Sequence, residues 1–310
     1  MRARNYYRKR QSSWPRYVLM AVLAVVMIAS LAGLIDYGVQ QQQTQSLHDE
    51  LRASLQTDLP PVTAVPAAQT PQPGDPAGEE AYAPDSPTAQ TGVVRPAATP
   101  TLPPWQTPEV LFTYQTLLER NPDLVGWLKM DRIYRVDFAV VQRDHSYYLR
   151  RDFDGKSNMN GTAFMDVSSA IWPRTDNLII YAHNMKSGEM FGELRRLLNE
   201  DYYREKPLTT FNTLYERGTY VPLAAFRCSI VPGENYFDLC VSEFDGPGGF
   251  GAYIDRARQL SSIHPPYDAQ WGDQLLTLVT CSDADEDRVV VLMRRIRPDE
   301  DRDALVQLWQ

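Results

Sequence analysis

A cysteine at the end of an apolar run is the first residue whose type and position could support chemistry. Cys281 follows the run LLTLVT and is followed at once by the acidic stretch SDADED. A cysteine inside such a run is usually a small buried hydrophobe, whereas a partly exposed thiol beside basic groups can be activated as a thiolate. Because the run ends at this residue, Cys281 is a candidate nucleophile.

A histidine and an arginine occupy comparable positions. His183 ends the apolar run NLIIYAH, and Arg288 opens the apolar run after the acidic stretch. If that stretch forms a hairpin loop, Arg288 faces Cys281 with Cβ atoms about 4.5–5.5 Å apart, while Arg294 and Arg295 lie about 20 Å away along the strand. Each residue alone has a plainer interpretation, His183 as a structural histidine and Arg288 as a surface charge that balances nearby carboxylates.

Together the three residues predict acyl transfer. Attack on a carbonyl requires a nucleophile, a group that protonates the leaving amine, and a donor for the developing oxyanion. Cys281, His183 and Arg288 supply these functions. With reference pKa values of about 8.5 for a thiol and about 6.5 for an imidazole, thiolate and imidazolium coexist in only a small fraction of molecules. Arg288 would raise that fraction and bind the oxyanion.

Such a site requires a sheet that brings several strand ends together. Short runs rich in β-forming residues predict strands at 133–142, 162–166, 177–183, 219–230, 236–244, 274–281 and 288–296. Helical spacing is found at 108–121, 190–204 and 251–262, the last just before the strand that ends at Cys281. Several short strands with few helices predict a mostly β fold, a closed or nearly closed β-barrel.

The N-terminal part has the pattern of a membrane anchor. Residues 17–35 are uncharged and mostly apolar, which is long enough to span a bilayer as a helix. A cleaved signal peptide is the alternative, because Ser30-Leu31-Ala32 loosely resembles a cleavage site. The basic residues of 1–16 favour a cytoplasmic N-terminus. With a net charge of −8 for the chain, this basic tip argues against nucleic acid as the main partner.

The composition divides the chain into four parts. Residues 1–16 form the cytoplasmic basic tip and 17–36 the transmembrane anchor. Residues 37–107 are expected to hold a short, weak juxtamembrane helix and then a disordered tether, since 13 of the 23 prolines lie within 60–108. The tether would hold the catalytic domain, 108–310, away from the membrane.

The other cysteines predict no disulfide framework and no metal site. Cys228 and Cys240 can pair across a turn in an oxidising compartment, and the sequence leaves this open. Together with His264 they lack the spacing of a zinc site. Neither a metal nor an organic cofactor is required by the predicted chemistry.

The stretch from about Asn121 to Ile296 resembles the class B sortases. The resemblance is carried, in order, by the segments NPDLVGWLKM, VVQRDHSYYLRRDFDGKSNMNGTAFMD, DNLIIYAHNMKSGEMF and LLTLVTC…RVVV. It implies a sortase-like closed barrel with an N-terminal helix and a helix inserted before the cysteine strand. It also implies that His183 is the general acid/base, Cys281 the nucleophile, and Arg288 the oxyanion and substrate anchor. The neighbouring Tyr181, Thr280 and Asp283 become candidate substrate-binding residues.

The resemblance further implies a cysteine transpeptidase on the outer face of the plasma membrane. Such an enzyme cleaves a C-terminal sorting motif of surface proteins after Thr, forms a thioester, and passes the acyl group to an amine of a peptidoglycan precursor or a pilin. Val279, Lys206-Pro207 and the short loop before Arg288 depart from the family pattern near the substrate groove, so the sorting motif stays open. The alternatives are an exported cysteine peptidase or peptidoglycan hydrolase, and a wall-binding module without catalytic activity.

Overall fold

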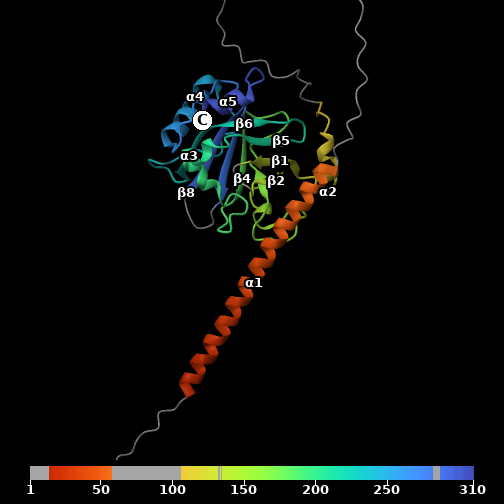
Figure 1. Ribbon diagram of the computed structural model, residues 1–310, viewed down its shortest axis with the longest axis vertical. Helices are drawn as coiled ribbons and strands as arrows, with labels where there is room; N and C mark the ends of the chain where they lie inside the picture. Colours follow the sequence, from red (N-terminus) through yellow and green to blue (C-terminus); the bar gives the residue numbers. More distant parts are fainter. Residues whose placement is uncertain (1–13, 58–105, 132, 134, 282–286) are drawn as a thin grey trace, which may run out of the picture.

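Eight strands close into a barrel in the order β1-β2-β3-β4-β7-β8-β6-β5 (Figure 1). The computed structural model describes residues 14–57, 106–131, 133, 135–281 and 287–310. The strands are β1 Leu124–Met130, β2 Asp137–Val141, β3 Ala163–Met165, β4 Asn177–His183, β5 Thr209–Thr213, β6 Thr219–Ser229, β7 Leu275–Cys281 and β8 Asp287–Arg295. The prediction of a closed β-barrel is confirmed.

The sequence pattern missed β1 and β5, which pair with each other and close the barrel. Gly126 explains why β1 carries a weak strand signal. A Cβ atom at this position would lie 2.2 Å from the backbone oxygen of Asn212 on β5, so only glycine lets the two strands approach this closely. A glycine lowers β propensity when the sequence is considered alone.

Strands β4 and β7 form a parallel pair in the middle of the barrel wall, aligned from Asn177–Leu275 to His183–Cys281. A buried polar contact fixes the register of the two strands towards their N-terminal ends, away from His183. The Thr277 hydroxyl donates to Asn177 Oδ1 at 2.8 Å, and Asn177 Nδ2 donates to the carbonyl of Val241 at 2.9 Å. A slip of one residue would leave these buried groups without partners, which fixes the alignment of the strand ends.

Short helices cover the barrel: α2 Gln115–Arg120, α3 Glu200–Arg204, α4 Gly246–Leu260 and α5 Arg302–Leu308, with 3₁₀ turns at Phe112–Tyr114, Tyr147–Arg150 and Leu194–Leu198. The long crossover from β6 to β7 contains α4, whose apolar side buries Phe250, Tyr253, Ile254 and Ala257 at the spacing of one helical face. The single helix predicted for 190–204 is instead a 3₁₀ turn followed by α3. The helix expected before the cysteine strand is α4.

The strand predicted for 236–244 is absent from the barrel, and the segment runs irregularly between β6 and α4. Its apolar residues are used differently. Phe237 packs against Phe226 of β6 and Tyr253 of α4, with ring centroids 4.9 and 4.8 Å away. A closed barrel offers no free edge to a further strand, so this β-rich run serves as a packing layer under α4.

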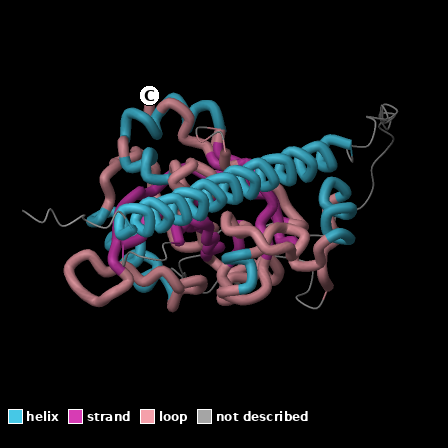
Figure 2. The backbone as a smooth tube through the Cα atoms, turned by 90° about the horizontal axis from the view of Figure 1, so that it is seen from below, coloured by secondary structure: helices cyan, strands magenta, loops and turns pink. Residues whose placement is uncertain are grey.

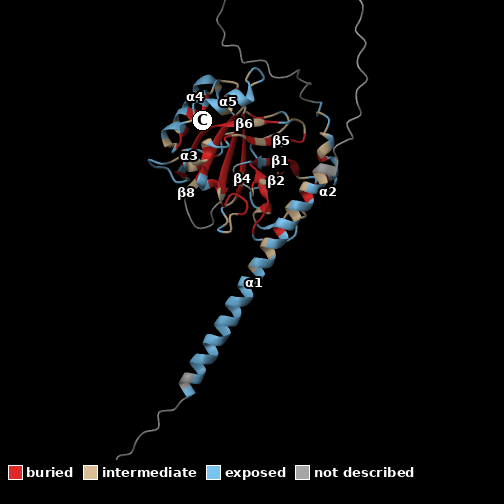
Figure 3. Cartoon of the chain, viewed as in Figure 1, coloured by how far each residue is buried: buried red, intermediate tan, exposed pale blue. Residues whose placement is uncertain are grey.

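One continuous helix, α1 Trp14–Thr57, carries the apolar run and continues beyond it (Figure 1). Figure 3 shows that its N-terminal part is exposed, whereas its C-terminal part has buried positions against the domain. The face that contacts the domain includes Thr44, Leu47, Leu51 and Leu55, a spacing of three to four residues. The short, weak juxtamembrane helix of the prediction is therefore a long helix that packs on the barrel.

The predicted proline-rich tether is flanked on both sides by residues that lie against the domain. Leu55, near the end of α1, and Leu111, five residues after the chain is described again at residue 106, line the same cavity. Figure 2, seen from below, shows α1 crossing in front of the domain, and Figure 1 shows that only its C-terminal part lies beside the barrel. Residues 58–105 themselves lie outside the described residues.

Candidate active site

The candidate site lies where β4 and β7 end side by side. In the parallel register His183 pairs with Cys281 as the last residues of the two strands. Neighbouring strands are about 4.8 Å apart, so the backbone alone holds the imidazole-bearing and thiol-bearing residues as direct neighbours. Two residues separated by almost a hundred positions in the sequence are brought together by one strand pair.

The ring of His183 is held by a backbone group. His183 Nε2 lies 2.6 Å from the carbonyl oxygen of Leu149. Since a carbonyl only accepts hydrogen bonds, Nε2 carries the proton in this contact. Nδ1 is then the ring nitrogen left to exchange a proton with a substrate or a thiol. Leu149 was not among the predicted site residues, because a backbone carbonyl leaves no signal in side-chain types.

The segment that carries the Leu149 carbonyl is tightly packed. Gly161 has a positive φ of 61°, and a Cβ atom there would lie 2.7 Å from the Leu149 oxygen and 2.5 Å from the Tyr148 oxygen. Thr162 N donates to the Tyr148 carbonyl at 3.0 Å. Glycine at 161 therefore leaves room for the carbonyl that contacts His183. The family resemblance includes this segment, but neither Gly161 nor Leu149 was singled out within it from the sequence.

Arg288 follows from the register of β7 with β8. Their pairs run from Leu275–Arg294 to Val279–Val290, and continuing this alignment by two residues sets Arg288 opposite Cys281. On its other side Arg288 pairs with Cys228 of β6. The guanidinium donates to the carbonyl of Asp287 at 3.1 Å.

Arg294 and Arg295 lie at the opposite end of β8. Arg294 pairs with Leu275, the first residue of β7, six residues from Cys281 and hence about 20 Å away. Its side chain is only 1% exposed and forms two contacts of 2.6 and 2.7 Å with the Glu300 carboxylate. Arg295 binds Glu216 at 2.7 Å. Both arginines stabilise the far end of the barrel.

The three candidate substrate-binding residues differ in placement. Tyr181 is half-buried two residues before His183 on β4, and its ring stacks on Phe164 with centroids 5.6 Å apart. Burial raises the pKa of Tyr181 well above its ordinary value. Thr280 is buried, and its hydroxyl oxygen accepts a hydrogen bond from Val289 N at 2.9 Å, so it holds the β7–β8 hairpin. Asp283 lies outside the described residues.

The other two thiols are poorly suited to nucleophilic attack. Cys228 and Cys240 are both free, so the disulfide that the sequence left open is not formed in this structure. Burial raises the pKa of Cys228 to about 11. Burial, together with the nearby Asp166 carboxylate, also raises the pKa of Cys240. At neutral pH both thiols are therefore almost entirely protonated.

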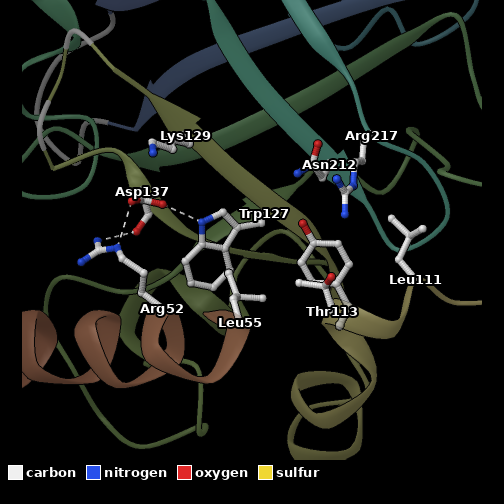
Figure 4. A pocket seen from close by; sticks show the side chains of 10 residues that line it. Arg52, Leu55, Leu111, Thr113, Trp127, Lys129, Asp137, Asn212 and Arg217 are labelled. Atoms are coloured by element: carbon white, nitrogen blue, oxygen red, sulfur yellow. Dashed lines mark hydrogen bonds and ion pairs between the residues drawn. The ribbon is translucent and has the colours of Figure 1, made fainter. Parts of the chain in front are cut away.

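A cavity of about 290 Å³ lies elsewhere, between α1 and the outer face of β1 and β5 (Figure 4). Trp127 lies across it, and the Trp127 indole N–H donates to Asp137 at 2.7 Å. Arg52 of α1 reaches the same carboxylate at 2.9 Å. Among the described residues, the side chains that line this cavity include none of the three predicted catalytic residues. We therefore assign the cavity to the packing of α1 against the barrel.

Comparison with known proteins identifies the family. The chain is 30% identical over 188 residues to sortase B of Listeria monocytogenes, covering 59% of this chain and 74% of that protein. It is 24% identical over 188 residues to sortase B of Staphylococcus aureus, covering 59% of this chain and 75% of that protein. No family model matches the chain.

Solved structures agree with this relationship. A crystal structure from Bacillus anthracis, described as similar to sortase B, superposes with a TM-score of 0.55 at 27% identity, covering 62% of this chain and 86% of that one. The crystal structure of Staphylococcus aureus sortase B superposes with a TM-score of 0.56 at 24% identity, covering 61% of this chain and 89% of that one. This likeness shows the shared fold. The chain therefore belongs to the sortase B family and is a cysteine transpeptidase.

Proposed function

We propose that Cys281, His183 and Arg288 carry out the transpeptidation. The Cys281 thiolate attacks the carbonyl carbon of a Thr in the sorting motif of a surface protein. Arg288 stabilises the oxyanion that forms. The C–N bond then breaks as His183 protonates the leaving amine, and a thioester to Cys281 remains.

The second half of the reaction returns the enzyme to its starting state. An amine attacks the thioester carbonyl, His183 takes the proton that the amine loses, and the Cys281 thiolate leaves. The acceptor is an amine of a cell-wall precursor or of a pilin. One solved sortase B structure is a complex with a triglycine peptide, so triglycine is one acceptor to test.

One observation carries this assignment: the pairing of His183 with Cys281 as the last residues of two adjacent parallel strands. Because the sheet backbone sets this neighbourhood, the two residues are held close together before substrate binds, which supports the proposal, since proximity lowers the barrier to nucleophilic attack. The raised pKa values of Cys228 and Cys240 disfavour these two thiols as nucleophiles, which supports the assignment of Cys281.

The protein acts at a membrane surface. One helix of the described part is long and apolar enough to cross a bilayer, and its apolar stretch is uncovered. The 19 residues of 17–35 measure about 28 Å as a helix, close to the thickness of a hydrocarbon core. With the basic residues of 1–16 retained in the cytoplasm, the catalytic domain lies outside.

The experiment that tests the function separates transfer from hydrolysis. A library of peptides, each with one Thr at the reactive position, is incubated with the protein with and without triglycine, and products are identified by mass spectrometry. A transpeptidase gives a new peptide joined to triglycine after Thr. The alternative, an exported cysteine peptidase or peptidoglycan hydrolase, gives the same acid product whether or not the amine is present.

A further inference from the structure

Helix α1 is attached to the catalytic side of the barrel by buried polar contacts. The Thr44 hydroxyl oxygen accepts hydrogen bonds from Asn158 Nδ2 at 2.9 Å and from Asn160 Nδ2 at 2.8 Å. All three residues are buried. One helical turn earlier, Gln40 Oε1 accepts a hydrogen bond from Met159 N at 3.0 Å. Leaving such buried amides without partners would be costly, so this junction is rigid.

The same junction lies close to the candidate site. Asn160 is followed by Gly161, which packs against the Leu149 carbonyl, and that carbonyl contacts His183 Nε2 at 2.6 Å. Two other segments contact α1 further along. Asp137, the first residue of β2, binds Arg52 at 2.9 Å, and Glu189 accepts from Gln45 at 2.7 Å.

The direction of α1 therefore relates the site to the membrane. The hydrogen bonds between α1 and the domain begin at Gln40 among the described residues, and the apolar run ends at Ile35. From Thr44 back to Ile35 the helix has nine residues, or about 14 Å of axial length. Figure 1 shows the N-terminal part of α1 extending away from the domain as a straight helix.

We propose that α1 is a rigid spacer that holds the catalytic strand ends at a fixed height, about 14 Å along the helix axis, above the bilayer. This inference rests on the proposed membrane anchor and sorting activity. The height selects a class of substrate: membrane-anchored polypeptides whose reactive Thr is far enough from their own apolar segment to reach the site.

The required distance follows from chain geometry. A fully extended chain spans at most about 3.3–3.6 Å per residue, so a spacer of about four residues is the shortest that reaches this height. Shorter spacers cannot reach. Longer spacers reach the site and lower the effective concentration of the reactive Thr only gradually. The reaction rate should therefore rise sharply at the threshold length and decline slowly beyond it.

The height is measured with the full chain in phosphatidylcholine–phosphatidylglycerol vesicles. The probe is a lipid-anchored peptide that ends in a maleimide, on spacers of about two, four, eight and twelve residues chosen to bracket the reach. Two reporters are used in a background with Cys228→Ala and Cys240→Ala. One retains Cys281, and the other carries Cys281→Ala with Met159→Cys, a position that is 38% exposed beside Gln40.

We expect Cys281 to react at least about tenfold more slowly with the two-residue spacer than with the eight-residue spacer, since a short chain cannot span the gap. The Met159→Cys reporter, beside Gln40 and only about 8 Å along the helix axis from Ile35, should have a lower threshold, near two residues. A helical insertion of seven residues between Gly38 and Val39 raises the domain by about 10 Å and moves the threshold by about three residues. A Gly-Ser insertion of equal length lets the domain approach the membrane and removes the threshold.

Equal labelling of Cys281 at every spacer length in the unmodified helix, or a threshold that the helical insertion leaves in place, would overturn the proposed spacer. Donor peptides on the same spacers should show the same threshold, while a soluble donor is turned over equally with and without the insertion. A protein that fails to float with vesicles refutes the anchor. Soluble transfer that survives Cys281→Ala refutes the catalytic assignment while the Met159→Cys reporter still reports the height.

Discussion

The proposed catalytic residues are placed by backbone pairing. His183 and Cys281 are partners in the β4–β7 ladder, and Arg288 continues the β7–β8 ladder that ends at Val279–Val290. The Leu149 carbonyl fixes one ring nitrogen of His183. Because sheet geometry sets these positions, a substitution at one of them removes a chemical group and leaves the strand pairing intact.

Arg288 is the residue whose removal separates oxyanion stabilisation from folding. Arg288→Ala should slow single-turnover acylation by about 10²–10³-fold, the usual cost of losing one oxyanion donor. Arg288→Lys should restore only part, since an ammonium keeps the charge and loses the planar fork. The matched control is Arg227→Ala, an exposed arginine of β6 paired with Val289. Equal losses for Arg288→Ala and Arg227→Ala would contradict the role.

A substitution of Arg294 should reduce stability and leave the acylation rate unchanged, the opposite of a substitution of Arg288. Arg294→Ala removes the two contacts of 2.6 and 2.7 Å that Arg294 makes with the Glu300 carboxylate, while Arg297 still contacts that carboxylate. The free energy of unfolding should fall by about 3 kcal/mol, the lower end of the range for a broken buried ion pair. The acylation rate of the folded fraction should stay close to that of the unchanged protein. Urea titration and single-turnover kinetics at low temperature measure the two effects. A stable but inactive Arg294→Ala protein would show that the register is wrong.

At the scale of elements, the strand ends of the proposed active site were predictable and the elements that support them were not. The run 177–183 was predicted with the bounds of β4, because its apolar residues are continuous and end at a polar loop. Strand β1 was missed because Gly126 is required by the close approach of β5, which is a tertiary effect. The β-rich run 236–244 was misassigned since closure of the barrel leaves it no partner strand.

The prediction of helix α1 was limited in the same way, by tertiary contacts that the sequence pattern does not reveal. Leu47, Leu51 and Leu55 follow each other at intervals of four residues, which is a signal for one apolar face, but the surrounding glutamines and charges weaken the prediction of a stable helix. The helix is stabilised by what it packs against. Its partners, among them Phe138 and Asn160, come from distant parts of the sequence.

His48 makes this packing sensitive to pH. Its ring lies 5.6 Å from that of Phe138, and burial, followed by the charge of Arg52, lowers the pKa of His48 to about 4 from its ordinary 6.5. Asp49 and Asp137 oppose this shift. The folded state binds a proton at His48 less tightly than the unfolded state does. Above pH 6.5 the ring is mostly neutral in both states, so His48 does not reduce the free energy of unfolding. As the pH falls from 6.5 towards 4, protonation favours the unfolded state and destabilises the docked helix.

Thermal unfolding from pH 7 to pH 4.5 measures the effect. The unchanged protein should lose on the order of 2 kcal/mol more than His48→Leu over this range, because leucine keeps the apolar contact and cannot bind a proton. His145→Gln is the control, since the side chain of His145 is 61% exposed. Parallel losses of stability in the unchanged protein and in His48→Leu would contradict the assignment.

At the scale of the whole molecule, the chain combines an uncovered apolar helix, a barrel with its predicted catalytic strand ends near that helix, and a basic N-terminus. The division into 1–16, 17–36, 37–107 and 108–310 remains a proposal, with the amendment that the end of α1 packs on the domain. The net charge of −8, with a basic tip, suits a protein whose acidic bulk lies outside the membrane.

The topology predicts a clear result in protoplasts. Protease added outside intact protoplasts should remove the globular domain and leave a membrane-embedded fragment that contains residues 17–35. Lysis should add no further cleavage of the domain. A domain that is protected until lysis would reverse the orientation, and a domain found only in the medium would favour the cleaved signal peptide.

The most direct test of the proposed mechanism is the site of the acyl-enzyme bond. The protein is incubated with a Thr-containing donor peptide and no acceptor, quenched in acid, digested, and mapped by mass spectrometry. We expect a thioester on Cys281 alone, which disappears in Cys281→Ala, forms far more slowly in His183→Ala, and is unaffected by Cys228→Ala or Cys240→Ala. An adduct on Cys240, or turnover that persists in Cys281→Ala, would contradict the mechanism.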